Sequence, residues 1–475
     1  MLFNSIDFAI FLPLVFVLYW FVTKRTLISQ NILIVLASYL FYAWWDYRFL
    51  ALIILSTLVD FIVAKQLENE TDNRLRKGLF LVSLLFNLGM LAFFKYFNFF
   101  IESWVEAWQL FGVTMETSTL KIILPVGISF YTFQTLSYTI DVYKNKIEPT
   151  SSFLEFAAFV SFFPQLVAGP IERASHLLPQ FKKKHIFNSE FAISGLYLII
   201  WGLFKKVVIA DNCAFFVNQI FDGATGYSSM ELFFGAILFG FQIYGDFSGY
   251  SDIAIGVARL FGFSLMTNFS FPYFSRDIAE FWRRWHISLS TWFRDYLYIP
   301  LGGSKGTTWQ GVRNVFIVFL VSGFWHGANW TFIVWGMIHA MLFLPLLLLG
   351  RNRTYVLSTK IYGSQVPKII LTFLVITLAW IFFRADSVNI AYQYIINLFS
   401  FNSSSVYMFY KTSKMILFST IIIFSIIILL LFEFLAIQNN KKEVQLTTYS
   451  AIFIVILICF MGVFKNPSEF IYFQF

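Results

Sequence analysis

The chain has 475 residues, of which 58% are hydrophobic, 21% aromatic and only 13% charged. Soluble globular chains are about 25% charged, so this sequence has too few charges to cover its 63 Phe and 14 Trp with a water-facing surface. The composition excludes a cytosolic enzyme, a disordered chain and a nucleic-acid-binding protein. The net charge of +8 does not point to nucleic acid, because the cations lie in short loops between apolar runs, as they do in multi-pass membrane proteins.

Apolar runs that approach the roughly 20 residues of a membrane helix recur along the whole chain. The first follows an N-terminus without the positive charge of a cleaved signal peptide, and so predicts an uncleaved span. The runs are continuous rather than alternating, which favours helices over a β-barrel. They lie near residues 8–22, 31–45, 49–64, 79–97, 120–140, 153–170, 191–210, 232–263, 314–349, 369–383, 415–437 and 448–464. We expect an all-α protein with about 10–13 membrane segments, some interfacial or re-entrant, in a single domain over residues 1–475.

Lysine and arginine alternate between the loops of the first half. The loops at Lys24–Arg25 and Lys65–Lys77 are basic, whereas Asn98–Leu120 contains acidic residues and no Lys or Arg. Because basic loops stay in the cytoplasm, we expect the N-terminus outside and the Lys65–Lys77 loop inside. The basic stretches Arg351–Lys368 and Lys441–Lys442 are then cytoplasmic too.

Two carboxylates interrupt the apolar run Tyr244–Phe263. Asp246 and Asp252 are six residues apart, so on a helix they diverge by about 240° and do not form a paired acid and base. Gly245 and Gly249 beside them predict a break or a re-entrant turn. We favour the interpretation that these carboxylates hold helices together, or pair with Arg259.

The least membrane-like stretch is Ser270–Arg313. On a helix over Ile278–Tyr296, one stripe collects the aromatic residues and the other side collects the charges, which is typical of a helix lying in the membrane interface. His286 falls at the edge of the aromatic stripe, and the exposed aromatic side would contact lipid or a partner. The cations either meet lipid phosphates or bind an anionic donor such as the phosphates of a coenzyme. They are Arg283, Arg284 and Arg294.

A second histidine, His326, stands between Gly323 and Gly327 in the apolar stretch Val321–Ala340. Ionisable groups at membrane depth are costly and usually line a pathway, and a neutral imidazole can carry a proton near neutral pH. Asn329 would share its helical face and fix the ring's tautomer. The alternative is a histidine satisfied by packing.

No metal site is expected. His339 lies about 220° around a continuous helix from His326, so the two would not share a ligand position. Cys213 and Cys459 are too few for a disulfide framework or a metal cluster.

Three motifs together resemble the membrane-bound O-acyltransferase family, and most closely its bacterial branch that acetylates alginate and peptidoglycan. They are SGFWHGANWTFIVWG around His326, FWRRWHISLSTWFRDYLYIPLGG around His286 and DFSGYSDIAIG around Asp246. Supporting stretches are LPVGISFYTFQTLSYTIDVYK from Leu124, FFPQLVAGPI from Phe162 and the tail FIYFQF from Phe470. The resemblance extends along essentially the whole chain.

This resemblance implies helices around a central tunnel in the bacterial cytoplasmic membrane, with His326 catalytic and His286 as the second characteristic residue. Trp325 and Asn329 would line the tunnel, and Arg283, Arg284 and Arg294 would bind the donor. It further implies cytoplasmic acetyl-CoA as donor substrate, with no bound cofactor. A periplasmic acetyltransferase partner would pass the acetyl group to a polysaccharide. His326 would act as a general base or through an acetyl-histidine.

Two other functions stay open. In a transporter without covalent chemistry, the carboxylates and histidine would form a proton relay, although the inverted repeats that would favour it are absent from the sequence. A sister branch of the family exports D-alanine from a carrier protein to teichoic acid and shares the histidine.

Overall fold

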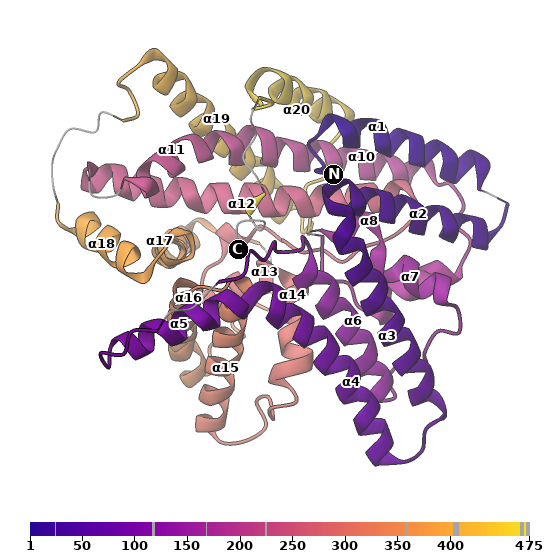
Figure 1. Cartoon of the computed structure of the whole chain (residues 1–475). Coiled ribbons are helices and arrows are strands. Elements are labelled where there is room, and N and C mark those ends of the chain that lie inside the picture. Colours follow the sequence, from indigo (N-terminus) through magenta and orange to yellow (C-terminus); the bar gives the residue numbers. More distant parts are fainter. Residues whose placement is uncertain are drawn as a thin grey trace. The chain divides into compact units, whose positions relative to one another are not determined.

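The computed structural model describes residues 1–23, 25–115, 119–167, 169–223, 226–356, 360–401, 408–465 and 470–471. Throughout this described part, every regular element is a helix (Figure 1), as the continuous apolar runs predict. Lys24 and the tail residues 472–475, which the sequence argument used, lie outside the described residues.

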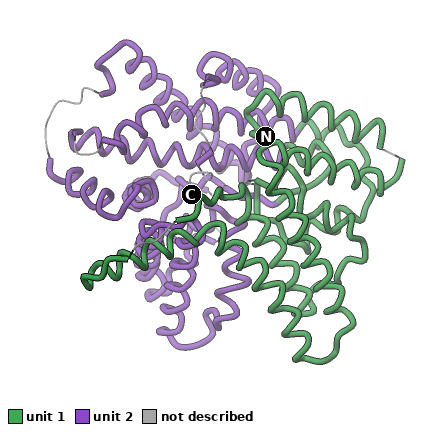
Figure 2. Tube along the Cα trace, in the orientation of Figure 1, with its two compact units in different colours: residues 1–193, 257–265 green, residues 194–256, 266–475 purple. Residues whose placement is uncertain are grey.

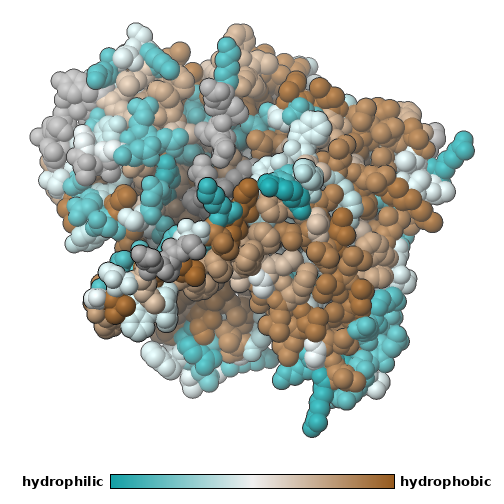
Figure 3. All heavy atoms as spheres, in the orientation of Figure 1, coloured by the Kyte–Doolittle hydropathy of each residue, from teal (hydrophilic) through white to brown (hydrophobic). Residues whose placement is uncertain are grey.

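Within the described residues, seven helical segments are long and apolar enough to cross a membrane, which confirms an all-α protein of the multi-pass class. They are Leu27–Asn69, Asn73–Gln109, Ser189–Asp222, Ser229–Leu260, Trp330–Leu348, Gly363–Arg384 and Ser413–Gln438. Ile6–Val22 and Thr448–Met461 are shorter apolar helices. On the face drawn in Figure 3, hydrophobic side chains cover much of the surface, as a protein surrounded by lipid requires. The central tunnel stays a prediction.

Two compact units make up the described chain (Figure 2): residues 1–193 with 257–265, and residues 194–256 with 266–475. The expectation of a single domain stays a prediction. The helices of unit 1 are α1 (Ile6–Val17), α2 (Leu27–Asp46), α3 (Leu50–Asn69), α4 (Asn73–Leu91), α5 (Phe97–Gln109), α6 (Ile128–Tyr143), α7 (Phe153–Ser161), α8 (Phe163–Leu166) and α9 (Ala174–Leu177).

A buried carboxylate that the sequence argument did not single out holds three helices of unit 1 together. Asp60 on α3 accepts hydrogen bonds from Ser83 and Asn87 on α4, the latter at 2.9 Å, and from Thr139 on α6 at 3.1 Å. Buried polar groups are costly unless they are satisfied. This network therefore fixes how α3, α4 and α6 pack.

Unit 2 contains most of α10 (Ser189–Leu203) and α12 (Ser229–Leu260), with the π-helical turn η5 (Phe204–Ala210) after α10. Its other helices are α11 (Asp211–Asp222), α13 (Ile278–Arg284), α14 (Ile287–Phe293), α15 (Thr308–His326), α16 (Trp330–Leu348), α17 (Val366–Arg384), α18 (Val388–Phe399), α19 (Ser413–Gln438) and α20 (Thr448–Met461). Another π-helical turn, η8 (Arg294–Tyr298), follows α14.

The predicted break at Gly245 and Gly249 is wrong, because α12 is continuous through both residues. The glycines instead let α12 approach its neighbour closely. A Cβ at Gly249 would lie 2.7 Å from the backbone oxygen of Gly202, and one at Gly245 would lie 2.8 Å from that of Lys205. Small residues serve this purpose where membrane helices touch backbone to backbone.

The carboxylates of α12 pair with lysines of η5. Lys205 Nζ lies 2.5 Å from Asp252 Oδ2, and Lys206 Nζ lies 2.8 Å from Asp246 Oδ1. The interpretation that these carboxylates hold helices together is confirmed, and pairing with Arg259 stays a prediction. Asp246 Oδ2 also accepts the backbone N–H of Ile471 at 2.7 Å, which anchors the C-terminal segment.

Candidate active site

The predicted helix over Ile278–Tyr296 is broken in the middle. α13 ends at Arg284, α14 begins at Ile287, and His286 between them adopts a left-handed backbone with φ of 43°. For a non-glycine residue that conformation costs on the order of 1–3 kcal/mol and persists only where its surroundings enforce it. The break rotates His286 away from the position that a continuous helix would give it.

Asn268 supplies the groups that hold this break. Its backbone oxygen accepts the Ile287 N–H at 2.8 Å, while its Oδ1 lies 3.1 Å from His286 Nδ1 and accepts the Ser288 hydroxyl at 2.9 Å. With Oδ1 as acceptor, the His286 ring carries its hydrogen on Nδ1 and a lone pair on Nε2. Asn268 was not predicted, because only the fold brings this residue, 18 positions away, to the ring.

Complete burial lowers the pKa of His286 to about 3. The ring packs edge-on against Phe247 with centroids 4.7 Å apart. His286 is therefore a neutral imidazole at physiological pH, as a proton acceptor or a hydrogen-bonding group must be.

His326 is the last residue of α15, and the chain turns at Gly327 into α16. It is 3% exposed, with Trp335 and Phe383 packed edge-on at centroid distances of 5.1 and 5.3 Å. Gly323 lets the two helices meet, since a Cβ there would lie 2.2 Å from the Phe332 oxygen. The helix end holds His326 in an aromatic enclosure.

The structure brings the two predicted histidines together. Their ring centroids are 6.5 Å apart, and Trp325 packs against both, 6.0 Å from His286 and 5.0 Å from His326. Their separation of 40 positions in the sequence gave no measure of this distance.

Asn329 does not fix the tautomer of His326 as expected. Its Oδ1 caps α16 by accepting the Thr331 N–H at 3.0 Å, and its Nδ2 donates to the Asp386 oxygen at 2.8 Å. The expectation assumed one continuous helix through both residues, whereas the turn at Gly327 separates them. Whether Trp325 and Asn329 line a tunnel is untested.

A third histidine, His339, joins the same aromatic cluster. Trp335 bridges the rings, 5.1 Å from His326 and 4.8 Å from His339, and the indole N–H of Trp282 donates to His339 Nδ1 at 3.3 Å. On one continuous helix, His339 would lie about 220° around the axis from His326, so the sequence did not predict that the two rings share a cluster. The turn between α15 and α16 brings them to it.

Two of the three predicted donor-binding arginines line one cavity of about 540 Å³ in unit 2. Arg283 and Arg284 stand there with Lys441 and Lys442, which come from a distant part of the chain. Arg284 is paired with Glu280 at 2.8 Å. Burial would raise the pKa of Glu280, but hydrogen bonds from Arg276 and the charge of Arg284 outweigh it and lower that pKa.

Arg283 is only partly satisfied by hydrogen bonds in this cavity. Its Nη1 donates to the Asn352 oxygen at 2.8 Å, but its buried Nη2 has no hydrogen-bond partner in the described chain. A buried guanidinium N–H without an acceptor is costly, so this position favours an anion.

Arg294 lies apart from the other two arginines. It lines a separate cavity of about 230 Å³ with Trp282, Ser322 and Arg353, and its side chain is 59% exposed and paired with Asp295 at 2.8 Å. Ser322 is one helical turn before His326, so this second cavity approaches the histidine from along α15.

The aromatic side of Trp282–Tyr296 is not the exposed surface that the sequence predicts. Trp285 is 1% exposed and stacks on Phe281 at 5.4 Å, while Trp292 and Phe293 are also buried. These rings form the interior of unit 2 instead of a face for lipid or a partner.

A model of the membrane-bound O-acyltransferase family matches residues 146–383, which include both histidines. The chain is 38% identical over 438 residues to the "Peptidoglycan O-acetyltransferase" of Helicobacter pylori, covering 86% of this chain and 81% of that protein. It is 40% identical over 408 residues to the "Probable alginate O-acetylase AlgI" of Pseudomonas aeruginosa, covering 85% and 76%.

A "Teichoic acid D-alanyltransferase" of Streptococcus thermophilus is 28% identical over 263 residues, covering 51% of this chain and 62% of that protein. The resemblance seen in the histidine motifs is thus confirmed over most of the length. The chain belongs to the membrane-bound O-acyltransferase family and is a multi-pass membrane O-acyltransferase.

Proposed function

We propose that this protein moves acetyl groups from cytoplasmic acetyl-CoA across the bacterial cytoplasmic membrane for O-acetylation of an extracytoplasmic polysaccharide. The polysaccharide is peptidoglycan or an alginate-like polymer, and a periplasmic partner transferase completes the transfer. The observation that carries this proposal is the pair of buried histidines 6.5 Å apart beside a basic cavity. The names of the relatives at 38% and 40% identity support acetyl as the group transferred.

His326 is the general base in this proposal. The incoming hydroxyl gives its proton to the imidazole while its oxygen bonds to the thioester carbonyl. The C–S bond then breaks, and the thiolate takes the proton, so that the products are an acetyl ester and a free thiol. A positioned general base typically contributes about 10²–10⁴-fold to the rate. His286 orients the reacting groups through Nε2, because Asn268 holds its other nitrogen.

Arg283 is the proposed contact for the donor's phosphates. Its unpaired buried Nη2 and the neighbouring Lys441 and Lys442 suit a multiply charged anion. Arg284 is held by Glu280 and has a structural role. We therefore expect Arg283→Ala to raise the KM for acetyl-CoA at least about tenfold, the equivalent of roughly 1.4 kcal/mol, while Arg284→Ala lowers thermal stability more than it changes KM.

The decisive experiment reconstitutes the purified protein in liposomes with labelled acetyl-CoA on the side of the basic cavity. Acetyl transfer should require His326. His326→Ala and His326→Gln should both abolish transfer at normal protein levels, while His185→Gln, a histidine of unit 1 outside the site, keeps it. Wild-type transfer in the His326 variants would end the catalytic role.

The same liposomes separate the alternatives. Acetyl ester on the polymer only after a periplasmic transferase is added supports the partner, whereas ester formed without it contradicts the partner. Transfer of D-alanine from a loaded carrier protein, with none from acetyl-CoA, would place the chain with the D-alanyl branch. Because Asp246 and Asp252 pair with lysines, this proposal gives them a structural role and not that of a proton relay.

A further inference from the structure

A groove of about 730 Å³ lies on unit 1 where α3 ends and α4 begins. That volume falls within the roughly 300–1,000 Å³ of small-molecule sites. Its lining is Phe61, Ile62, Lys65, Gln66, Asn69, Glu70, Arg74, Leu75, Gly78, Leu79 and Val82. None of these residues takes part in the candidate active site.

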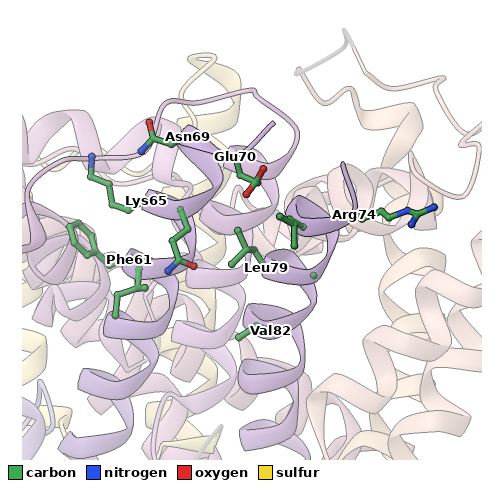
Figure 4. A pocket seen from close by; sticks show the side chains of 11 residues that line it. Phe61, Lys65, Asn69, Glu70, Arg74, Leu79 and Val82 are labelled. Atoms are coloured by element: carbon green, nitrogen blue, oxygen red, sulfur yellow. The ribbon is translucent and has the colours of Figure 1, made fainter. Parts of the chain in front are cut away.

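The lining is divided into a polar level and an apolar level. Figure 4 shows Lys65, Asn69, Glu70 and Arg74 near the interhelical loop, with Leu79 and Val82 further along the helices. In Figure 3 the hydrophilic residues of unit 1 likewise gather at the tip of the α3–α4 hairpin, next to a hydrophobic surface. Such a division matches a phospholipid, which is charged at one end and apolar at the other.

The groove is a built feature, because the two helices are fixed beside it. Asp60 ties α3 to Ser83 and Asn87 of α4, and Arg76 of α4 donates to the oxygen of Leu67 on α3 at 2.6 Å. Between these ties stands Gly78, where an added Cβ would find no atom within 4 Å. Because Gly78 has no side chain, the groove stays open at this position. The hydrogen bonds on either side of it hold α3 and α4 in place, so the helices do not move together to fill the groove.

The length of the groove suits one leaflet. From Phe61 to Asn69, and from Arg74 to Val82, each helix advances about 12 Å. The hydrocarbon of one leaflet is about 15 Å thick. An acyl chain whose headgroup sits at the polar level therefore follows the groove for most of its depth.

The charges indicate the headgroup. Lys65 is held only by an exposed pair with Glu68 at 2.9 Å, so it can meet a phosphate. Arg74 points away from Lys65 on the other side of the groove (Figure 4), so one phosphate does not meet both cations. Glu70 accepts the Asp72 N–H with Oε1, which leaves its other oxygen for a donor. A headgroup beside Glu70 is therefore favoured when it donates hydrogen bonds beyond its phosphate.

We propose that this groove binds one glycerophospholipid with a donating headgroup, its phosphate at Lys65 and its ammonium or hydroxyl group at Glu70. Phosphatidylethanolamine and phosphatidylglycerol carry such donors, and phosphatidylcholine does not. The site is independent of acyl transfer.

The test measures lipid retained by the full-length protein in native mass spectrometry, after transfer from nanodiscs of phosphatidylethanolamine, phosphatidylglycerol or phosphatidylcholine with matched acyl chains. We expect one tightly held lipid from the first two and less from the third. Gly78→Leu fills the groove and should lower retention about tenfold. Gly89→Leu is the matched control, because Gly89 lies on the same helix with open space around it and outside the groove.

Charge variants test the headgroup contacts. Lys65→Ala should lower retention about fivefold, whereas Arg74→Ala, at a side chain that points away from Lys65, should lower it less. Glu70→Gln should narrow the difference in retention between phosphatidylethanolamine and phosphatidylcholine. Equal retention by the Gly78→Leu and Gly89→Leu variants overturns the proposal. So does equal retention of all three lipids, or a dimer that Gly78→Leu dissociates, which would make a second copy the occupant.

Discussion

At the scale of single residues, Asn268 determines the orientation and the tautomer of the His286 ring. Its amide oxygen leaves the ring neutral, and burial keeps the pKa of His286 near 3. The wild-type enzyme should therefore show no titration of His286 between pH 5.5 and 8. Because the unfolded state takes up this proton below about pH 6.5 and the folded state does not, this group lowers stability as pH falls, by up to about 1.4 kcal/mol per pH unit.

Asn268→Asp should create an acid limb in the pH–rate profile. A carboxylate about 3 Å from the ring favours the imidazolium and raises the pKa of His286, so protonation begins within the measured range as pH falls. Activity should then decline on the acid side, where the wild type is flat. Asn268→Ala, which lacks both acceptor and charge, should lower activity at every pH. A profile for Asn268→Asp that overlays the wild type would contradict this role.

Sequence motifs identified the residues that carry the chemistry, but not those that position them. His326 stood out because ionisable groups are rare in apolar stretches, His286 lay at the edge of an aromatic stripe, and the family motifs named both. Asn268, His339 and Lys441 reach the same region only through breaks in helices and through long-range packing. An interpretation that assumes one continuous helix contains neither breaks nor long-range contacts. It therefore predicted the wrong contacts for Asn329 and for the aromatic stripe.

At the scale of elements, the α15–α16 hairpin sets the position of His326. A Cβ at Gly323 would lie 2.2 Å from the Phe332 oxygen, and one at Gly336 would lie 2.4 Å from the Phe319 oxygen. Gly323→Ala must push the two backbones apart and shift the helix end that carries the histidine. We expect at least a tenfold loss of activity, since small displacements of reacting groups are costly.

Gly311→Ala is the control for this effect. Gly311 lies on the same helix with no atom within 4 Å of an added Cβ, so alanine should improve the helix slightly and leave activity unchanged. Both variants would be compared by acetyl transfer and by thermal unfolding in detergent. Full activity in Gly323→Ala would show that the hairpin tolerates the shift.

The buried charges on η5 join α11 and α12 within unit 2. Lys206 stands between Asp211 at 3.0 Å and Asp246 at 2.8 Å. Lys206→Met should destabilise the protein by about 3–5 kcal/mol, because it leaves two buried carboxylates without their cation. Lys411→Met, at an exposed position, should have little effect. Thermal unfolding of the two variants side by side measures the difference, and equal values would exclude a structural role for the cluster.

At the scale of the whole molecule, composition predicted a membrane protein, because so few charges cannot cover a water-facing surface. The continuous apolar runs predicted that its membrane segments are helices. They could not separate spanning helices from buried or bent ones. The run at 232–263 is a single long helix, and its glycines are contacts and not breaks. The periodicity of a sequence describes one segment at a time. Whether a glycine is a break or a close contact, and which group a carboxylate pairs with, depends on the helix that packs against that segment.

The orientation of the chain follows from its charges, and two engineered cysteines test it. Lys77 and Glu106 are both exposed and lie near opposite ends of the helical segment Asn73–Gln109. They lie on different helices, α4 and α5, which the π-helical turn η3 (Ala92–Tyr96) joins. The basic loop before α4 and the acidic stretch after η3 predict opposite sides of the membrane for the two positions. In a Cys459→Ser background, with the remaining Cys213 buried, an impermeant maleimide should label Glu106→Cys in intact cells. It should label Lys77→Cys only after permeabilisation, because the positive-inside rule keeps the Lys65–Lys77 loop in the cytoplasm. The reverse pattern would invert the predicted topology of this segment, while labelling of both positions from outside would show that Asn73–Gln109 does not cross the membrane.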